Sequence, residues 1–516
     1  MGEQTQADDP RAATTFPQLV RAAAAAYGED VAVVLRGDDN REGGGADETI
    51  SFAALDRRSA ELARGLIARG IGKGARVGFI HGNGPDFAVT LAAIARIGAV
   101  AVPISTMIRA NELVRVLRQS DVGGLFVQRG LLGHDLVERL CDALPELRGA
   151  SEGALRLLQA PYLRWVVSTG EGLPAAIHGP EFLTDAARSV SDDILRAVEA
   201  DVHPTDQMVE IYTSGSMALP KGVKHNHGPV LFRAHYIREM IGAERGKEIP
   251  AVMPMFWVGG LMMSLLPNWE IGAVTVCGER TLSNSRMAMG SVLAPEDIAL
   301  IAQNRPYWGL GMSETLGPYS YGDEVRVPAY PLCAPMDHIA DGYEVRVADE
   351  HGRPVGEGEI GEMQVRGYAL TPGLHKVERD GYFTPDGYYH TGDMCLIDGA
   401  RIYFVGRNGD MIKTAGSNVS PAEVEMELAA LDGVHNAYVV GLPDAERGQL
   451  VVAALVARDG ATLDFAEIEA ALRKRLSGFK VPRAYVALER DEVPLLHSNK
   501  VSRRQLEALL AEKLGR

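Results

Sequence analysis

The first half of the chain alternates between two patterns of apolar positions. Apolar residues recur near helical spacing over 17–27 and 52–69, which predicts two amphipathic helices. The short apolar run at 75–81 predicts a buried strand, and residues 86–98 predict the helix that follows it. Strands that alternate with helices are typical of helices layered on a mostly parallel sheet, so the sequence predicts an α/β fold.

The pattern changes near residue 342, where strict alternation replaces helical spacing. Between 342 and 367, polar and apolar residues alternate around glycine turns, which predicts β-hairpins. Residues 433–458 also predict strands, whereas helical spacing predicts helices over 464–477 and 502–514. The end of the chain is therefore expected to form a small α+β unit.

Residues 210–228 read EIYTSGSMALPKGVKHNHG and suit a phosphate. Small hydroxyl and glycine residues let backbone N–H groups approach a ligand closely, and Lys221 adds positive charge. The stretch is expected to be a loop between a strand at 208–213 and a helix at 228–242. A Walker A loop needs Gly-Lys followed by Ser or Thr, and this stretch has Pro-Lys-Gly, which argues against a P-loop ATPase.

The composition limits the kinds of ligand and the cellular compartment that are expected. A net charge of −16 argues against non-specific nucleic-acid binding, so local positive groups must hold any anionic ligand. The four cysteines lack metal-like spacing and are too few for a disulfide scaffold, which fits a reducing cytoplasm. Residues 1–16 lack the apolar core of a signal peptide, and the apolar stretch 253–269 is too short to span a bilayer. His225 and His227 lie two positions apart, but no carboxylate or cysteine is placed to complete a zinc site.

Four further stretches extend the pattern of the phosphate loop. They read GLGMSET at 309–315, YYHTGD at 388–393, YFVGRNGDMIKTAGSNVSPAEVE at 403–425 and PLLHSNKVSR at 494–503. Together with residues 210–228, they resemble the signatures of the adenylate-forming superfamily. That superfamily includes the acyl-CoA synthetases of the AMP-dependent synthetase and ligase family, peptide-synthetase adenylation domains and luciferases. The resemblance covers nearly the whole chain and rests on five motifs in order.

The resemblance implies a fold and a reaction. The fold would have a large N-terminal domain, here 1–406, of layered sheets and helices with a β-rich subdomain. A small C-terminal α+β lid domain would occupy 410–516, with the hinge near 408–410. Family members activate a carboxylic acid with Mg-ATP, which forms an acyl-adenylate and releases pyrophosphate. They then usually pass the acyl group to a thiol. Both reactants of the first step are anions, so catalysis depends on positioning and charge neutralisation.

By the same resemblance, several residues would bind the nucleotide. They would contact its phosphates, adenine and ribose. The residues are Thr213, Ser214, Gly215, Ser216, Lys221, Gly290, Ser291, Val292, Asp393, Arg407 and Lys413. Asp393 would accept hydrogen bonds from both ribose hydroxyls, assisted by Arg407, because a carboxylate has lone pairs for two donors. The cofactors implied are ATP, Mg²⁺ and CoA.

Three residues would be catalytic by the same resemblance: Lys500, Glu314 and Ser313. Glu314 would hold Mg²⁺ together with Thr213, and Ser313 would contact the α-phosphate. Lys500 would bridge the acyl carboxylate and the α-phosphate.

The acyl pocket is expected to include Trp257, Gly259 and Gly311. Trp257 lies in a segment that looks like the family's aromatic gate, at a position where His is common. Gly311 stands where acetyl-activating members carry a Trp that closes the pocket. A glycine leaves that space open, so the expected substrate is a medium-chain or bulky carboxylic acid.

The chain departs from the family pattern at three places. Met217 and Ala218 replace the usual Thr-Gly of the phosphate loop, and Leu496 and Asn499 replace Thr and Gly in the last motif. Only about ten residues lie between Arg280 and the adenine loop at Gly290, which is too few for the helix and strand found there in relatives. Divergence, a truncated gene product and an inactive homologue stay open as explanations.

The sequence thus predicts a cytoplasmic, ATP-dependent acyl-CoA ligase of fatty-acid or related metabolism. Its partners would be a small carboxylic acid and CoA, with no nucleic acid and no stable membrane insertion, and a homodimer is left open. Two alternatives stay open: a ligase that loads a carrier protein, and a nucleotide-binding homologue without activity.

Overall fold

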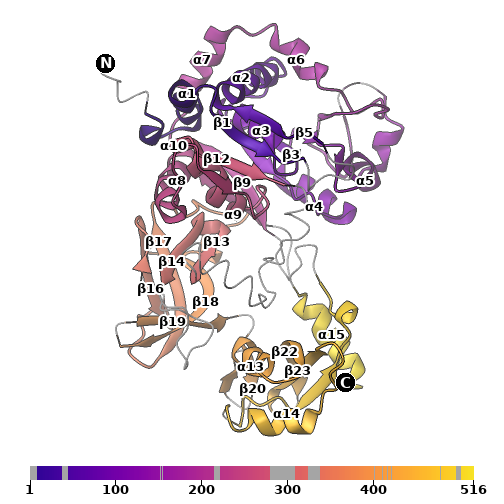
Figure 1. Ribbon diagram of the computed structural model, residues 1–516, viewed down its shortest axis with the longest axis vertical. Helices are drawn as coiled ribbons and strands as arrows, with labels where there is room; N and C mark the ends of the chain where they lie inside the picture. The colour runs from indigo at the N-terminus through magenta and orange to yellow at the C-terminus, as the bar shows by residue number, and fades with distance from the viewer. Residues whose placement is uncertain are drawn as a thin grey trace. The chain divides into compact units, whose positions relative to one another are not determined.

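The computed structural model forms two compact units (Figure 1). The first unit comprises residues within 1–285, 311–317 and 368–379, and the second comprises residues within 286–310, 318–367 and 380–516. The structure describes residues 9–37, 45–151, 153, 155–213, 221–278, 308–322, 338–399, 401–408, 411–414, 417–419, 421–444, 446–476, 478–495 and 501–516.

A six-stranded sheet forms the centre of the first unit, in the order β10-β9-β4-β3-β5-β8. Its strands are β3 (Arg76–Ile80), β4 (Val100–Pro103), β5 (Gly124–Val127), β8 (Trp165–Ser168), β9 (Gln207–Thr213) and β10 (Lys221–Asn226). All neighbouring pairs are parallel except β9 and β10, which are antiparallel. The predicted α/β fold with a mostly parallel sheet is confirmed.

A second, four-stranded sheet of this unit has the order β11-β12-β1-β2. Its strands are β1 (Val31–Leu35), β2 (Glu48–Ser51), β11 (Glu248–Pro250) and β12 (Val274–Cys277). β1 pairs in parallel with β12 and antiparallel with β2.

Helix α3 (Pro85–Ala95) is buried along almost its whole length. Every residue from Phe87 to Ala95 is buried, because α3 contacts β4 of the larger sheet, β1 and β2 of the smaller sheet, and helices α1 (Phe16–Tyr27) and α2 (Phe52–Ala68). A helix enclosed on all sides is expected to be apolar all round, as this sequence is. Phe87 also meets Phe79 of β3 edge to face, with ring centroids 5.0 Å apart.

Figure 1 shows α2 beside β1 of the smaller sheet and α3 among the strands of this unit. The helices of this unit other than α3 include α1 (Phe16–Tyr27), α2 (Phe52–Ala68), α4 (Ala110–Ser120), α5 (Leu136–Ala143), α6 (Glu181–Ala187), α7 (Asp192–Ala200) and α8 (His227–Ile241). The apolar stretch 253–269 contributes α9 (Val258–Gly260), a π-helical turn (Leu261–Leu265) and the start of α10 (Leu266–Ile271). Within the described ranges, no helix is long and apolar enough to cross a membrane.

One expectation about the phosphate loop is wrong. The stretch at 221–226 was expected to be part of a loop before a helix, but it forms strand β10. β10 pairs with β9 from Lys221 opposite Thr213 to Asn226 opposite Gln207. Residues 214–220 therefore join two antiparallel strands, and α8 begins directly after the second of them. Short mixed runs such as KGVKHN become strands through tertiary pairing more than through their own pattern.

The second unit contains an antiparallel sheet in the order β16-β17-β18-β19. Its strands are β16 (Tyr343–Ala348), β17 (Ile360–Gly367), β18 (Tyr389–Asp398) and β19 (Arg401–Arg407). The hairpins predicted after residue 342 are thus confirmed. Three strands precede this sheet in the chain: β13 (Trp308–Met312), β14 (Gly317–Gly322) and β15 (His338–Ile339). Ser320 of β14 pairs with Ile339 of β15.

The end of the chain forms a small α+β group, as predicted (Figure 1). Its strands are β20 (Ile412–Thr414), β21 (Ser417–Val419), β22 (Val434–Asp444), β23 (Gly448–Ala457) and β24 (Ala484–Ala487), and its helices are α13 (Pro421–Ala429), α14 (Phe465–Leu472) and α15 (Arg503–Lys513). α14 ends earlier than predicted, and turns follow Leu472. The predicted boundary between 406 and 410 stays a prediction.

Packing around α3 should dominate the stability of the first unit. Leu91 of α3 is fully buried, whereas Leu158 is 83% exposed. We expect Leu91→Ala to lower the free energy of unfolding by about 2–5 kcal/mol, because it removes buried methylene groups and leaves a cavity. Leu158→Ala, the matched control, should change it by less than about 0.5 kcal/mol. Urea unfolding followed by fluorescence measures both, and equal effects would contradict this account of the core.

Candidate functional site

The candidate phosphate loop is closed by a strand pair. Thr213 ends β9 and Lys221 begins β10, and the two residues are partners in the register of the hairpin. Lys221 is half-buried. The loop residues Ser214, Gly215 and Ser216 lie outside the described residues, so their role stays a prediction.

A buried polar network lies at the base of this hairpin. Glu210 of β9 is fully buried, and its Oε1 accepts a hydrogen bond from the Tyr212 hydroxyl at 2.8 Å. Its Oε2 accepts from Nε of Arg76 at 3.2 Å, so the buried carboxylate has a charged partner. A Cβ at Gly222 would lie 2.6 Å from Glu210 Oε1, which explains why a glycine follows Lys221.

The segment after Tyr368 runs along the other edge of β10. The backbone N–H of Lys224 donates to the carbonyl of Gly373 at 3.3 Å, and the N–H of His375 donates to the carbonyl of Gly222 at 2.7 Å. The Thr371 hydroxyl is 2.8 Å from the carbonyl oxygen of Lys224. β10 is therefore hydrogen-bonded on both edges within the first unit.

The predicted catalytic pair Ser313 and Glu314 forms a tight turn between β13 and β14. Residues Ser313–Thr315 make one 3-10 turn, and the Thr315 hydroxyl accepts from the N–H of Met312 at 3.1 Å. Leu316 follows with φ of 51°, a left-handed conformation that costs a non-glycine residue strain energy. Both Ser313 and Glu314 are half-buried.

Two hydrogen bonds connect this turn to β10 and to the segment beside it. Nε2 of His225 lies 2.7 Å from the carbonyl oxygen of Ser313. The N–H of Thr371 donates to the carbonyl of Glu314 at 2.8 Å. The structure thus brings Lys221, Ser313 and Glu314 into one unit through β10, as their shared motif family implied. Sequence reasoning considered His225 only as a metal ligand and did not identify Thr371.

The predicted ribose pair is an ion pair of the second unit between a buried carboxylate and an exposed guanidinium group. Asp393 of β18 is 1% exposed and lies opposite Arg407 of β19. Nε of Arg407 lies 2.8 Å from Asp393 Oδ1, and the Tyr319 hydroxyl donates to Oδ2 at 3.3 Å. Burial, with the nearby carboxylate, raises the pKa of Tyr319 well above its usual value, so this hydroxyl stays protonated. Tyr319 was not predicted, since no sequence pattern links β14 to β18.

For Lys413 and the expected acyl-pocket residues, the structure gives individual positions but no contacts that join them into one site. Lys413 is an exposed residue of β20. Trp257 precedes α9, is half-buried and meets Phe256 edge to face at 5.4 Å. A Cβ at Gly259 would lie 2.6 Å from the Met253 sulfur, so this glycine allows close packing. Gly311 of β13 is exposed, and the grouping of these residues into one pocket stays a prediction.

Several predicted residues lie outside the part of the chain that the structure describes. They are Lys500, the adenine-loop residues Gly290, Ser291 and Val292, the substituted positions Met217, Ala218, Leu496 and Asn499, and the shortened stretch before Gly290. Their assignments stay predictions.

The residues predicted for Mg²⁺ fit that ion in kind. Mg²⁺ is usually bound by one or two carboxylates together with substrate phosphates. Glu314 offers one half-buried carboxylate on a turn that is held by two hydrogen bonds. Among the described residues, no group of three or more His, Cys, Asp and Glu is placed to hold a metal by itself.

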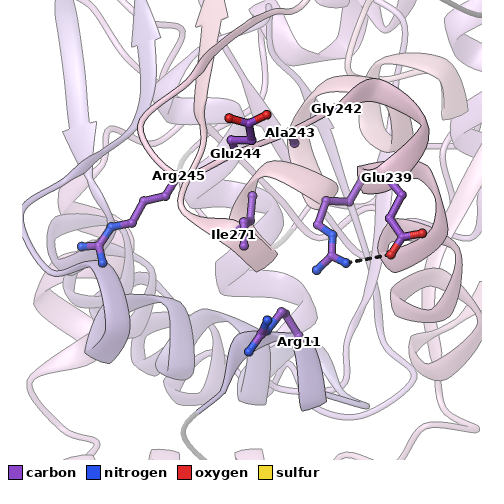
Figure 2. Close-up of a pocket in the computed structure, with 8 residues that line it drawn as sticks. Arg11, Glu239, Gly242, Ala243, Glu244, Arg245 and Ile271 are labelled. Carbon is purple, nitrogen blue, oxygen red and sulfur yellow. Dashed lines mark hydrogen bonds and ion pairs between the residues drawn. The ribbon is translucent and has the colours of Figure 1, made fainter.

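A polar hollow of about 390 Å³ on the first unit is lined by residues that the sequence did not single out. Figure 2 shows its lining, which includes Arg11, Glu239, Arg245 and Ile271. Its arginines each pair with a carboxylate, in the pairs Arg11–Asp9, Arg238–Glu239 and Arg245–Asp30. Because these charges are balanced locally, the hollow does not indicate an anion site.

The order of the motifs and the fold agree with one family. Residues 20–292, more than half of the chain, match the AMP-binding enzyme family. The chain belongs to the AMP-binding enzyme family. Residues 423–500 match the C-terminal domain that accompanies AMP-binding enzymes. The predicted family is confirmed, and so is the prediction of an enzyme.

Relatives match this AMP-binding enzyme over most of its length. Feruloyl-CoA synthase of Amycolatopsis sp. is 28% identical, with 89% of this chain and 93% of that protein covered. Indoleacetate–CoA ligase of Aromatoleum aromaticum is 25% identical, with 90% and 94% covered. Both relatives are named for joining an acid to CoA, as was expected of this family.

Solved structures share the fold. The anthranilate CoA ligase AuaEII in complex with anthranoyl-AMP superposes with a TM-score of 0.75 at 19% identity, covering 97% of this chain and 98% of that one. ATP-bound MatB from Rhodopseudomonas palustris gives 0.74 at 21% identity, covering 97% and 100%. The predicted fold class, a large N-terminal domain with a small C-terminal domain, is therefore confirmed.

The assignment of Asp393 to the ribose can be tested by measuring nucleotide binding. We expect Asp393→Asn to weaken ATP binding by roughly 10-fold or more, because a charged hydrogen bond is worth about 1.5–3 kcal/mol. Titration calorimetry measures the ATP Kd directly. Asp398→Ala, at the exposed end of the same strand, is the matched control and should leave Kd unchanged. An unchanged Kd for Asp393→Asn, in a folded protein, would reject the ribose assignment.

Proposed function

We propose that this AMP-binding enzyme is an AMP-forming acid–CoA ligase that activates a medium-chain or bulky carboxylic acid. The observation that carries the proposal is the match over about nine-tenths of the chain to relatives named as CoA synthases and CoA ligases. The hydrogen-bonded placement of Lys221, Ser313 and Glu314 in one unit supports it.

The reaction would have two steps. In the first, a carboxylate oxygen of the acid attacks the α-phosphorus of ATP, the bond to the bridging oxygen breaks, and pyrophosphate leaves. In the second, the CoA thiol loses its proton and attacks the acyl carbon, the bond to the phosphate oxygen breaks, and AMP leaves. The thiol step would follow rotation of the proposed lid domain, 410–516, about a hinge near Gly409.

The chain's own residues would hold these reactants by charge and hydrogen bonding. Lys221 and the loop before it would neutralise the β- and γ-phosphates, where the leaving pyrophosphate gains charge. Asp393 would accept from the ribose hydroxyls. Glu314 and Thr213 would hold Mg²⁺, which when bound neutralises phosphate charge. Ser313 would donate its hydroxyl hydrogen to an α-phosphate oxygen.

The proposed acid is supported by the absence of a side chain at Gly311 and by the relatives' names. Feruloyl, indoleacetyl and crotonobetainyl groups are all larger than acetyl. Since those names describe other proteins, the particular acid must be found by experiment.

The test is a screen for pyrophosphate release with ATP, Mg²⁺ and a panel of acids. The panel contains ferulate, indoleacetate, crotonobetaine, anthranilate, malonate and acetate, each with and without CoA. We expect acid-dependent pyrophosphate release and a CoA thioester with one of the larger acids. AMP release only with a phosphopantetheinylated carrier protein would favour the carrier-loading alternative. ATP binding without pyrophosphate release from any acid would favour an inactive homologue.

The pocket hypothesis predicts a change in substrate size. We expect Gly311→Trp to shift preference toward acetate and propionate, because an indole ring would fill the space left by the missing side chain. Relative kcat/KM across acids of increasing size measures the shift. Gly381→Trp is the control, since a Cβ atom there would meet no other atom within 4 Å. An unchanged size profile would show that Gly311 does not line the pocket.

The two-step mechanism predicts separate losses for Lys500. We expect Lys500→Ala to lower pyrophosphate formation by about 10²–10³-fold, because it removes one preorganised charge at the reacting phosphate. Conversion of a supplied acyl-adenylate to acyl-CoA should stay near the wild-type rate. Lys474→Ala, an exposed lysine of the same unit, should affect neither step. Equal loss of activity in both steps, in a folded protein, would overturn the proposed rotation of the lid domain between the steps.

A further inference from the structure

The Ser313–Glu314 turn is held at two neighbouring carbonyl groups. The Ser313 carbonyl accepts from His225 at 2.7 Å, and the Glu314 carbonyl accepts from the backbone of Thr371 at 2.8 Å. The residue that follows the 3-10 turn, Leu316, has the left-handed φ of 51°. A strained conformation of this kind persists only when its surroundings hold it. The two hydrogen bonds are contacts that can do so.

His225 is suited to holding one geometry. It is fully buried, and its Nδ1 has no hydrogen-bond partner among the described residues. Since a carbonyl oxygen only accepts, Nε2 must carry the proton and donate to Ser313. Burial lowers the pKa of His225 to about 4, so the ring is neutral near pH 7. A neutral ring with one donor in use can satisfy its bond in one orientation only.

Strand β10 connects this contact to the phosphate loop. Side chains alternate along a strand, so Lys221, Val223 and His225 lie on the same face of β10. Four residues of strand span about 13 Å, which is the expected separation of the Lys221 and His225 backbones. Because both edges of β10 are paired, with β9 and with residues 371–375, this spacing is rigid.

We infer that His225 is a positioning residue for the proposed reaction: through the Ser313 carbonyl, it sets where the Ser313 hydroxyl and the Glu314 carboxylate meet the nucleotide phosphates. The inference rests on the proposed function for the identity of the reaction. The hydrogen bond itself does not depend on that function. Groups that orient the residues around a metal or a reacting phosphate typically change activity 10–100-fold when removed.

Two amide substitutions distinguish the two ring nitrogens of His225. The amide nitrogen of Gln reaches about as far as Nε2, whereas that of Asn reaches about as far as Nδ1. We expect His225→Gln to keep kcat for pyrophosphate formation within about 3-fold of wild type. His225→Asn should lower that kcat about 10–100-fold, with the ATP KM changed by less than about 3-fold. The melting temperatures of both variants are measured in parallel.

The outcomes separate a positioning role from a structural one. Loss of kcat in His225→Asn with rescue in His225→Gln supports the inference. Equal activity of the two variants, or losses that follow melting temperature alone, overturns it.

A measurement on the wild-type protein tests the geometry without any substrate. In ¹⁵N-histidine NMR at pH 7, we expect the signal of His225, assigned by its loss in His225→Gln, to show protonated Nε2 and unprotonated Nδ1. The opposite tautomer or a charged ring would overturn the inference. If wild-type protein releases no pyrophosphate with any acid, the proposed function fails, whereas the tautomer result still stands on its own.

Discussion

Strand β10 can lie inside the first unit only because hydrogen bonds occupy both of its edges. A buried backbone N–H or carbonyl group without a partner costs free energy comparable to a lost hydrogen bond. β9 supplies partners on one edge, and Gly373 and His375 supply them on the other. This requirement brings together 207–226 and 368–379, which are far apart in the chain, and hydrogen bonds from His225 and Thr371 add the stretch 311–317. Among the residues proposed to act on the phosphates, Thr213, Lys221, Ser313 and Glu314 lie on these stretches, whereas Lys500 belongs to the last motif of the chain.

Buried charges impose a second constraint on the same elements. Glu210 is enclosed beneath the hairpin and is matched by Arg76 and the Tyr212 hydroxyl. In the second unit, Asp393 is enclosed and matched by Arg407 and the Tyr319 hydroxyl. Because both carboxylates are buried, removing their partners would leave a charge without compensation, which is unfavourable. Such pairs therefore fix the positions of their strands as well as satisfying the charge.

These constraints limit which parts of the fold can vary between members of the family. Relatives of this AMP-binding enzyme carry names that specify chemically different acids. Function resides in sites placed on a shared fold, and the acyl pocket can vary where it does not disturb the paired strands. Gly311, which is proposed for the acyl pocket, lies exposed on β13, so a side chain there would not break a buried hydrogen-bond network.

The sequence by itself determined the α/β pattern, the helices near 17–27, 52–69 and 86–98, the hairpins after residue 342, and the family. Each of these depends on local periodicity or on a motif, which can be read along the chain. Only the tertiary structure decided that 221–226 is a strand, that His225 meets Ser313, and that Tyr319 meets Asp393. The last two contacts join residues 88 and 74 positions apart. Periodicity shows which face of an element is buried, but the residue that it meets there depends on strand register and packing.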